Sequence, residues 1–302
     1  MIGLLNNSEI DRTEWDACMA EADSSFLYGR SWFLDLIAPG WCAIADGGYQ
    51  TVMALPSGRK YGIRYLFTPP FMQKTGLFSR NSENEPAVAE LLKYLSEQYR
   101  YIDLSLASNP GNLPGRITER DNYILPLNDS YRVLRENYTS ACRRNMRIAG
   151  TGRAAITTEI NPQEAIALFR KGPGSRVRGI AEQDYSDLEK VMHHSIASGE
   201  GRILGFRSEE GLFYSIFYIV TGRRITLLFT STSEESRNRK AGYVMIDYLI
   251  REFAGTGMVI DFAGSSVYGV AQFISSFGAV RAPYYRYLLN RLPWPVSLFK
   301  EG

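Results

Sequence analysis

Residues 259–265 read VIDFAGS and place Asp261 inside what is otherwise the pattern of a buried strand. A similar stretch occurs earlier, where Ile-Asp-Leu occupies 102–104 in YIDLSLAS. Each copy follows a helical stretch, and an LFT triplet precedes that stretch at 66–68 and again at 228–230. The two triplets are offset by 162 and 158 residues, which is too similar for chance and indicates an internal repeat.

The periodicity of the second half predicts an α/β fold. From residue 154 onward the order is a strand, two helices, three strands, a helix, a strand, a short helix and a last strand. This order predicts a mixed sheet covered by helices. Because the first half repeats part of it, we expect two similar units, 1–153 and 154–302, each a central mixed sheet flanked by helices. One arginine-rich helix over 130–149 is predicted to join them.

Composition excludes several classes of protein. The 34 Lys and Arg residues against 32 Asp and Glu leave a formal charge of +2, so the chain is no polycation and any contact with nucleic acid must be local. The first residues lack the pattern of a secretory signal and no run of 18 apolar residues occurs, which favours the cytoplasm and no insertion into a membrane. Three widely spaced cysteines and two histidines predict neither a disulfide framework nor a metal site.

The two copies differ most between the LFT triplet and the helix that follows it. The first copy has PPFMQKTG (69–76), whose prolines lack N–H donors, whereas the second has the polar and basic STSEESRNRKAG (231–242). A helix that begins behind a basic loop suits a phosphate or pyrophosphate group. The residues predicted to hold that group are Arg237, Arg239, Lys240, Ala241 and Gly242. The alternative is that this loop, with two glutamates and three cations, is solvated surface.

The strand, the loop and the helix together resemble the acyl-CoA pyrophosphate site of the GNAT acyltransferase superfamily. That pattern is Arg or Gln, two residues, Gly, one residue, and Gly or Ala. Arg237 and Gly242 match its ends, and Lys240 stands where the middle glycine is expected. AQFISSFGA resembles the later helix of the superfamily through Phe273 and Gly278. Ile274 occupies the place of a tyrosine that often protonates the departing thiolate, so the resemblance leaves that role vacant or filled from elsewhere.

Over nearly the full chain, the order of elements and the segments YLFTPPFMQKTG, RRNMRIA and DFAGSSVYGVAQFISSFGA resemble FemAB/FemX-like proteins, which are tandem GNAT folds. The resemblance implies transfer of an acyl or aminoacyl group, from acyl-CoA or from aminoacyl-tRNA, to an amine of a small molecule or a peptidoglycan precursor. It places the donor in the second unit. The residues expected along the donor, with backbone N–H groups for the developing oxyanion, are Leu228, Phe229, Thr230 and Ser231. The long coiled-coil arm of several tRNA-dependent members is not evident here.

The chemistry also needs a group that handles the amine proton. An amine with a pKa near 10.4 costs about 4 kcal/mol to present neutral at pH 7.4, unless a base or a desolvating site helps. Asp261 is one candidate, and its alternative role is structural, since Asp103 repeats it in a copy without the basic loop. Ser265 and Tyr268 occur only in the second copy and are predicted to contact substrate.

Three further interpretations follow from the residues. The basic face of the 130–149 helix, with Arg132, Arg135, Arg143 and Arg147, suits tRNA phosphate or an anionic precursor, or it is a solvated face. The loop GPGSRVRG (172–179) lies where GNAT proteins recognise acceptors. A catalytically inactive tandem GNAT fold that binds a ligand or a protein is the alternative to an enzyme, because Lys240 and Ile274 depart from the GNAT pattern.

Overall fold

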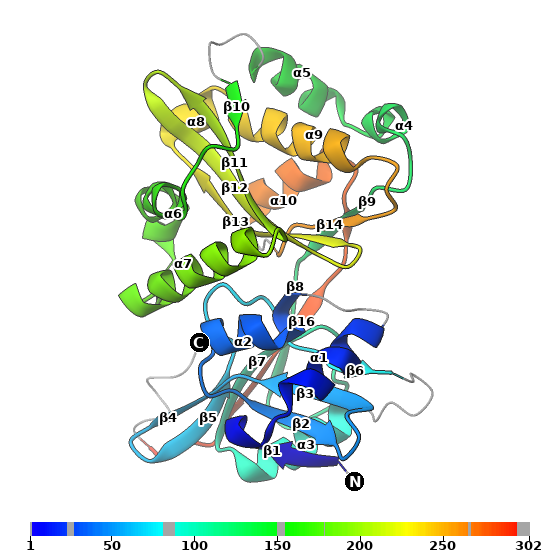
Figure 1. The fold of residues 1–302 in the computed structure, drawn as a ribbon, viewed down its shortest axis with the longest axis vertical. Helices are drawn as coiled ribbons and strands as arrows, with labels where there is room; N and C mark the ends of the chain where they lie inside the picture. The colour runs from blue at the N-terminus through cyan, green and yellow to red at the C-terminus, as the bar shows by residue number, and fades with distance from the viewer. Residues whose placement is uncertain are drawn as a thin grey trace. The chain divides into compact units, whose positions relative to one another are not determined.

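The computed structural model describes residues 2–22, 27–80, 88–149, 155–177, 179–264 and 267–294 (Figure 1). The chain divides into two compact units, and unit 1 is made of two segments that are distant in sequence. Unit 1 comprises Met1–Arg120 and Pro283–Gly302, and unit 2 comprises Asp121–Ala282. Two units were predicted, but these bounds differ from the division at residue 153, because residues 121–153 group with unit 2 and residues 283–302 with unit 1.

Unit 1 has a four-stranded sheet in the order β1-β2-β3-β6 and a five-stranded sheet in the order β4-β5-β7-β16-β8. Its strands are β1 (Ile2–Leu5), β2 (Cys42–Asp46), β3 (Thr51–Leu55), β4 (Ser57–Lys60), β5 (Ile63–Phe67), β6 (Leu77–Ser79), β7 (Tyr101–Leu106), β8 (Arg116–Arg120) and β16 (Tyr284–Asn290). Its helices are α1 (Arg12–Glu21), α2 (Ser31–Ile37) and α3 (Val88–Gln98) within the described residues. The apolar face of α3 packs on the five-stranded sheet through Leu91, Leu92 and Leu95.

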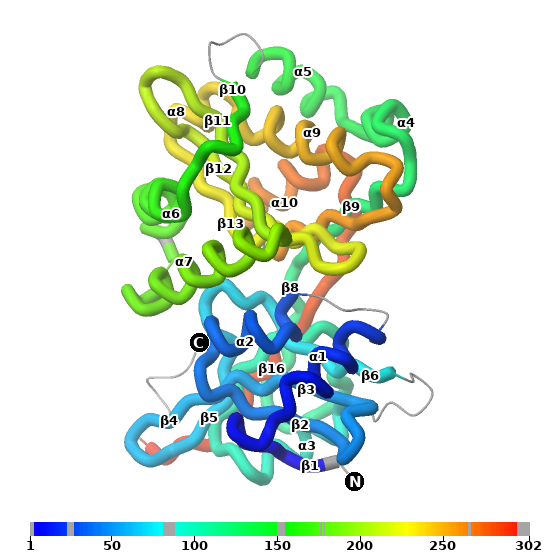
Figure 2. Tube along the Cα trace, in the orientation of Figure 1, coloured from blue at the N-terminus to red at the C-terminus, as the bar shows by residue number. Residues whose placement is uncertain are grey.

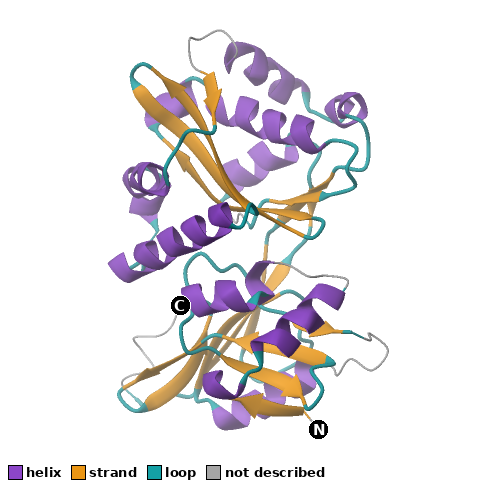
Figure 3. Ribbon diagram, viewed as in Figure 1, coloured by secondary structure: helices purple, strands orange, loops and turns teal. Residues whose placement is uncertain are grey.

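Unit 2 is built on one seven-stranded sheet in the order β10-β11-β12-β13-β14-β9-β15. Its strands are β9 (Tyr123–Pro126), β10 (Ala155–Thr157), β11 (Gly201–Ser208), β12 (Gly211–Thr221), β13 (Arg224–Thr232), β14 (Val259–Asp261) and β15 (Val280–Arg281). Its helices are α4 (Tyr131–Glu136), α5 (Ser140–Ala149), α6 (Pro162–Lys171), α7 (Glu182–Ala197), α8 (Glu234–Asn238), α9 (Ala241–Phe253) and α10 (Tyr268–Ser275). Helices cover both faces of this sheet, α6 and α7 on one and α9 and α10 on the other (Figure 3).

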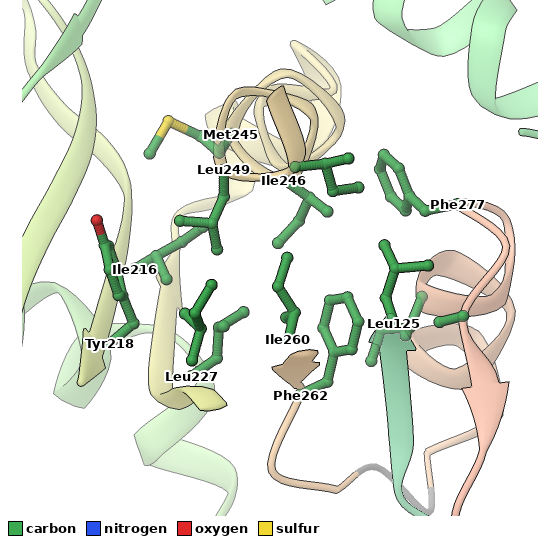
Figure 4. Close-up of a cluster of buried hydrophobic side chains, with 14 of the residues drawn as sticks. Leu125, Ile216, Tyr218, Leu227, Met245, Ile246, Leu249, Ile260, Phe262 and Phe277 are labelled. Carbon is green, nitrogen blue, oxygen red and sulfur yellow. The ribbon is translucent and has the colours of Figure 1, made fainter. Parts of the chain in front are cut away.

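The core of unit 2 lies between the sheet and α9. Met245, Ile246 and Leu249 point from α9 toward strand residues that include Leu227 and Ile260 (Figure 4). These side chains are at most 3% exposed, as the 3.6-residue period of the helix and the two-residue period of the strands require. The same periods predicted both elements, and their bounds agree with the sequence pattern within one or two residues.

The predicted repeat is present as a parallel strand pair with a crossover helix in each unit. In unit 1, β5 pairs in parallel with β7 through α3, and in unit 2, β13 pairs in parallel with β14 through α9. The register places Phe67 opposite Asp103 and Thr226 opposite Asp261. The two aspartates are therefore equivalent, whereas the second LFT triplet lies beyond the paired part of β13.

The two halves of the sequence exchange one strand each. β8 ends in unit 1 and the next strand, β9, pairs with β14 and β15 of unit 2, whereas β15 ends in unit 2 and the next strand, β16, pairs with β7 and β8 of unit 1. Figure 2 shows β16, from the orange-red end of the colour bar, among segments coloured blue and cyan. This exchange explains the bounds, since the sequence order alone assigns β9 to the first half and β16 to the second.

The arginine-rich segment is not one helix and does not link the units. It forms α4 and α5, and Thr139 between them accepts a hydrogen bond from the Cys142 N–H at 3.1 Å, which starts a new helix. Both helices belong to unit 2, where Tyr131 and Tyr138 donate hydrogen bonds to Asp247 on α9 at 2.9 and 3.0 Å.

The described part of the chain contains no helix with the length and apolar character that crossing a membrane demands. The three cysteines are buried and free.

Candidate functional site

The second parallel pair opens after a short distance. β13 pairs with β14 only at Arg224, Ile225 and Thr226 within the described residues, although β13 continues to Thr232. A β-bulge in the pairing of β12 with β13 falls where Leu228 has no partner, between the pairs that Leu227 and Phe229 make. Bulges bend a strand and redirect its backbone, and no pairing of β13 with β14 beyond Thr226 occurs among the described residues.

The register shows which backbone groups face the open edge of β13. The Ser233 N–H donates to the Phe213 carbonyl at 2.9 Å, and Tyr214 lies opposite Thr232. In an antiparallel ladder this makes Thr232 and Thr230 members of non-hydrogen-bonded pairs, whose N–H and C=O groups point away from β12. The Thr230 backbone therefore faces the edge that β14 leaves, where an N–H donor for an oxyanion was predicted.

The side chains along β13 lie mostly in the interior. Leu228 and Phe229 are buried, and Phe229 packs against Phe169 of α6 with ring centroids 5.4 Å apart. The Ser231 hydroxyl donates to the Ala165 carbonyl at 3.0 Å. These contacts hold β13 against α6, so only the backbone of the strand, and not these three side chains, is directed to the open edge.

The basic segment after β13 is not a plain loop. Glu234–Asn238 form the short helix α8, which the Ser233 hydroxyl caps by accepting the Ser236 N–H at 3.0 Å. Lys240 then adopts a left-handed conformation with φ 56° and ψ 28° and precedes α9. This conformation favours glycine, so Lys240 supplies at this position the backbone geometry that glycine adopts most readily.

The three cations of this segment differ in what they contact. Arg239 pairs with Glu235 at 2.6 Å and with Glu210 at 3.3 Å, and it lies over the Phe213 ring at 4.9 Å. Arg237 is exposed and Lys240 is half-buried. The three predicted cations therefore differ. Arg239 forms ion pairs with neighbouring residues, whereas Arg237 and Lys240 precede α9 and make no ion pair among the described residues.

Gly242 brings α9 close to two aromatic rings. A Cβ atom there would lie 3.2 Å from Phe273 Cζ and 3.4 Å from the Tyr214 hydroxyl. Ala241 beside it is fully buried. Close packing is therefore a reason for glycine at this position, and the phosphate contact stays a prediction.

Tyr214 is a residue that sequence reasoning missed. It is 7% exposed on β12, and burial raises the pKa of its hydroxyl to about 12, although a hydrogen bond with the Thr230 side chain opposes the shift. Tyr214 thus touches both β13 and the start of α9. In the sequence it is one of several aromatic residues in LFYSIFYIV, and only the strand register distinguishes it.

The three residues predicted to act on substrate have different surroundings. Asp261 is 1% exposed, and its carboxylate accepts from Asn122 Nδ2 at 2.9 Å, the Ala263 N–H at 3.0 Å and Arg224 Nη1 at 2.7 Å. These contacts match the structural alternative for this acid. Tyr268 is 75% exposed, and its hydroxyl accepts from Gln272 at 2.6 Å. Ser265 lies outside the described residues.

The position of the expected GNAT tyrosine is part of the core. Ile274 is 4% exposed within the cluster that includes Phe277 and Ile260. A tyrosine hydroxyl at this site would be buried among apolar groups, which explains why an aliphatic side chain fits here. Among the described residues no three His, Cys, Asp or Glu side chains gather as a metal site requires.

No model of a protein family matches the chain, and no curated protein matches it by sequence. Comparison with solved structures gives FemX at 15% identity and a TM-score of 0.63, covering 97% of this chain and 99% of FemX. The chain has the FemX fold. A conserved protein of unknown function from Bacteroides thetaiotaomicron is similar at 11% identity and a TM-score of 0.59, over 95% of this chain and 99% of that one. L-PGS from Bacillus licheniformis is similar at 13% identity and 0.55, over 96% and 95%.

The FemX fold confirms the fold predicted from the resemblance to FemAB/FemX-like proteins. It extends over both units, since 97% of the chain is covered. The exchanged strands and the open edge of β13 therefore lie within one fold of the FemX type. At 15% identity this comparison shows the fold, and the reaction has to be argued from the residues of this chain.

Proposed function

We propose that this protein transfers an acyl group from acyl-CoA, or an aminoacyl group from aminoacyl-tRNA, to an amine. The observation that carries the proposal is the open edge of β13, where the Thr230 backbone faces away from β12 beside the start of α9. A pantetheine arm or an aminoacyl end can pair with this edge as a further strand does. Its phosphate groups then lie at the start of α9, beside Arg237 and Lys240.

The proposed reaction uses few side chains. The amine nitrogen attacks the donor carbonyl carbon, and the Thr230 N–H stabilises the oxyanion that forms. The thiolate of CoA, or the ribose oxygen of tRNA, then leaves with the electron pair and takes up the proton that the attacking nitrogen loses as the amide forms. Tyr268 and Ser265 are the side chains we propose for contact with the acceptor, and Asp261 stands behind them. Tyr214 is a second hydroxyl close to the donor strand, with a pKa raised to about 12 by burial.

The resemblance of the sequence to FemAB/FemX-like proteins, which transfer aminoacyl or acyl groups, supports a transferase, and the chain has the fold of FemX. The acceptor that we propose is an amine of a small molecule or of a peptidoglycan precursor. We propose that the segment following α6 contacts the acceptor, and its proximity to β13 supports this: a Cβ atom on Gly172 would lie 2.4 Å from the Thr232 carbonyl oxygen, so Gly172 contacts the end of β13. Lys171 and the short helix Pro173–Arg176 adjoin this contact.

The test is a double variant, Arg237→Ala with Lys240→Ala. We expect the Kd for acetyl-CoA, measured by calorimetry, to rise about 10-fold or more, which corresponds to about 1.4 kcal/mol. The matched control is Arg132→Ala with Arg135→Ala, which removes the same charge from the exposed face of α4 in the same unit. For acetyl-CoA this control keeps the wild-type Kd. For aminoacyl-tRNA the control pair also tests the basic face of α4 and α5.

An unchanged Kd in the Arg237/Lys240 variant would remove this segment from the donor site. The second candidate function is a catalytically inactive module that binds a ligand or a partner protein. The buried Ile274 and the packing of Gly242 on aromatic rings favour it. The inactive binding module is supported if neither acetyl-CoA nor aminoacyl-tRNA raises the melting temperature of the wild-type protein.

A further inference from the structure

The two equivalent aspartates are held from equivalent positions, by the residue before β9 in unit 2 and by a residue of β16 in unit 1. Asp261 lies opposite Ile124 of β9, and Asp103 lies opposite Leu288 of β16. Two residues before each of these partners stand Asn122 and Arg286, respectively. Asn122 donates to Asp261 at 2.9 Å, and Arg286 makes a two-pronged contact with Asp103 at 2.6 and 2.7 Å.

The chain takes opposite courses after the two aspartates. In unit 1, β7 continues to Leu106 and pairs in parallel with Thr75, whose N–H donates to the Ser105 carbonyl at 2.8 Å. The Thr68 N–H also donates to the Asp103 carbonyl at 3.0 Å. Residues 68–75 therefore occupy the edge of β7, and the first parallel pair remains covered by its own chain.

In unit 2 the chain turns away at the equivalent positions. Ala263 and Gly264 adopt φ values of 54° and 89°, and the paired part of β14 ends at Asp261. An alanine rarely adopts the left-handed conformation without support from its surroundings. This turn takes β14 away from β13 and leaves the edge that carries the Thr230 backbone.

Asn122 supports this turn from both ends of its amide. Its Nδ2 donates to Asp261, and its Oδ1 accepts the Gly264 N–H at 2.6 Å. Asp261 in turn accepts the Ala263 N–H at 3.0 Å, so both left-handed residues are bound to one network. Asn122 is 0% exposed, which strengthens these bonds by excluding water. An arginine, the equivalent in unit 1, has only donors and cannot accept the Gly264 N–H.

We propose that Asn122 is a positioning residue that holds the Ala263–Gly264 turn and thereby keeps the edge of β13 open for the donor. The proposal rests on the proposed function for the part that concerns the donor. For the turn itself it rests on the buried amide and the two left-handed residues.

The test compares Asn122→Ala with the double variant Asn122→Ala/Ala263→Gly, using acetyl-CoA as the probe. We expect Asn122→Ala to raise the Kd for acetyl-CoA about 5-fold or more and to speed hydrogen exchange of the Ala263 amide about 10-fold or more. Glycine adopts the left-handed conformation without strain, so Ala263→Gly restores binding in the double variant to within about 2-fold of wild type. General destabilisation would not be corrected by this one substitution.

Arg286→Ala is the matched control, since it removes the equivalent partner of the aspartate in unit 1 and leaves acetyl-CoA binding unchanged. A wild-type Kd together with a wild-type exchange rate in Asn122→Ala would overturn the proposal. If the wild-type protein binds neither acetyl-CoA nor aminoacyl-tRNA, the donor function is overturned. The exchange rate of residue 263 then still decides whether Asn122 holds the turn.

Discussion

Lys240 provides a sharp test of the backbone at the proposed donor site. It is the residue before α9, with φ 56° and ψ 28°, in the place where the GNAT pattern has a glycine. Lys240→Gly and Lys240→Ala both remove the ammonium group. Only the glycine removes the Cβ atom that disfavours this conformation, so the difference between the two variants isolates the cost of the backbone.

The magnitude follows from two opposing effects. An L-residue in the left-handed region costs about 1–2 kcal/mol. Glycine loses about 0.5–1 kcal/mol more than alanine in chain entropy on folding. We therefore expect Lys240→Gly to exceed Lys240→Ala by about 0.5–1 kcal/mol in free energy of unfolding. Side-chain contacts contribute little to this difference, since neither variant has a side chain beyond Cβ.

The assay is urea unfolding followed by far-ultraviolet circular dichroism, which reports on both units. Tryptophan fluorescence serves as a second probe, because all four tryptophans lie in unit 1 and Lys240 lies in unit 2. Equal stability of the two variants by circular dichroism would show that residue 240 is not left-handed in solution. The Kd for acetyl-CoA should be equal in the two variants whichever stability result is obtained, because both lack the same charge.

Two further predictions concern the contact of α4 and α5 with α9. Asp247→Ala removes the acceptor for the hydroxyls of Tyr131 and Tyr138. In a urea titration it should lower the free energy of unfolding by about 2–4 kcal/mol. The control, Arg132→Ala on the exposed face of α4, should change the free energy of unfolding by less than about 0.5 kcal/mol. Burial and then Asp247 raise the pKa of Tyr131 to about 12, and burial and Asp247 also raise that of Tyr138. Because these folded-state values lie above the unfolded value of about 10, their contribution to stability is complete below about pH 10 and declines as the pH rises toward 12. Unfolding between pH 9 and 11.5 should show this decline, and Tyr138→Phe should reduce its slope; an equal slope in that variant would contradict the assignment.

Local patterns predicted the elements of unit 2 well. The nearly continuous apolar runs of β12 and β13 reflect burial on both faces of the sheet, and the helical period of α9 reflects burial on one face, so the sequence alone contains the information. The repeated aspartates were also informative, because Asp103 and Asp261 occupy equivalent positions in two parallel pairs. The two LFT triplets do not occupy matching positions in the two strand pairs. Phe67 of the first triplet lies opposite Asp103, whereas Thr226, which precedes the second triplet, lies opposite Asp261. The triplets did not predict this register, because hydrophobic triplets are common in buried strands.

Long-range pairing was not predictable from the same patterns. β16 was predicted as the last strand and β9 was not predicted as a strand, and nothing in either stretch indicates that it pairs with the other half of the chain. The unit bounds were missed for this reason. The break between α4 and α5 was missed because Arg and Asn residues continue a helical pattern across Thr139, whereas the structure uses Thr139 as a cap.

The site shows how two copies of one fold can come to differ. Both aspartates are anchored by the exchanged strand, so the acid belongs to the fold in each unit and carries no distinction between them. What differs is the partner: Arg286 neutralises Asp103 with donors alone, and β7 runs on to pair with Thr75. Asn122 combines a donor for Asp261 with an acceptor for Gly264, and β14 ends there. We therefore expect one position, Asn122 beside the exchanged strand, to separate the open strand pair from the covered one, and the open pair is the one that adjoins the basic start of α9.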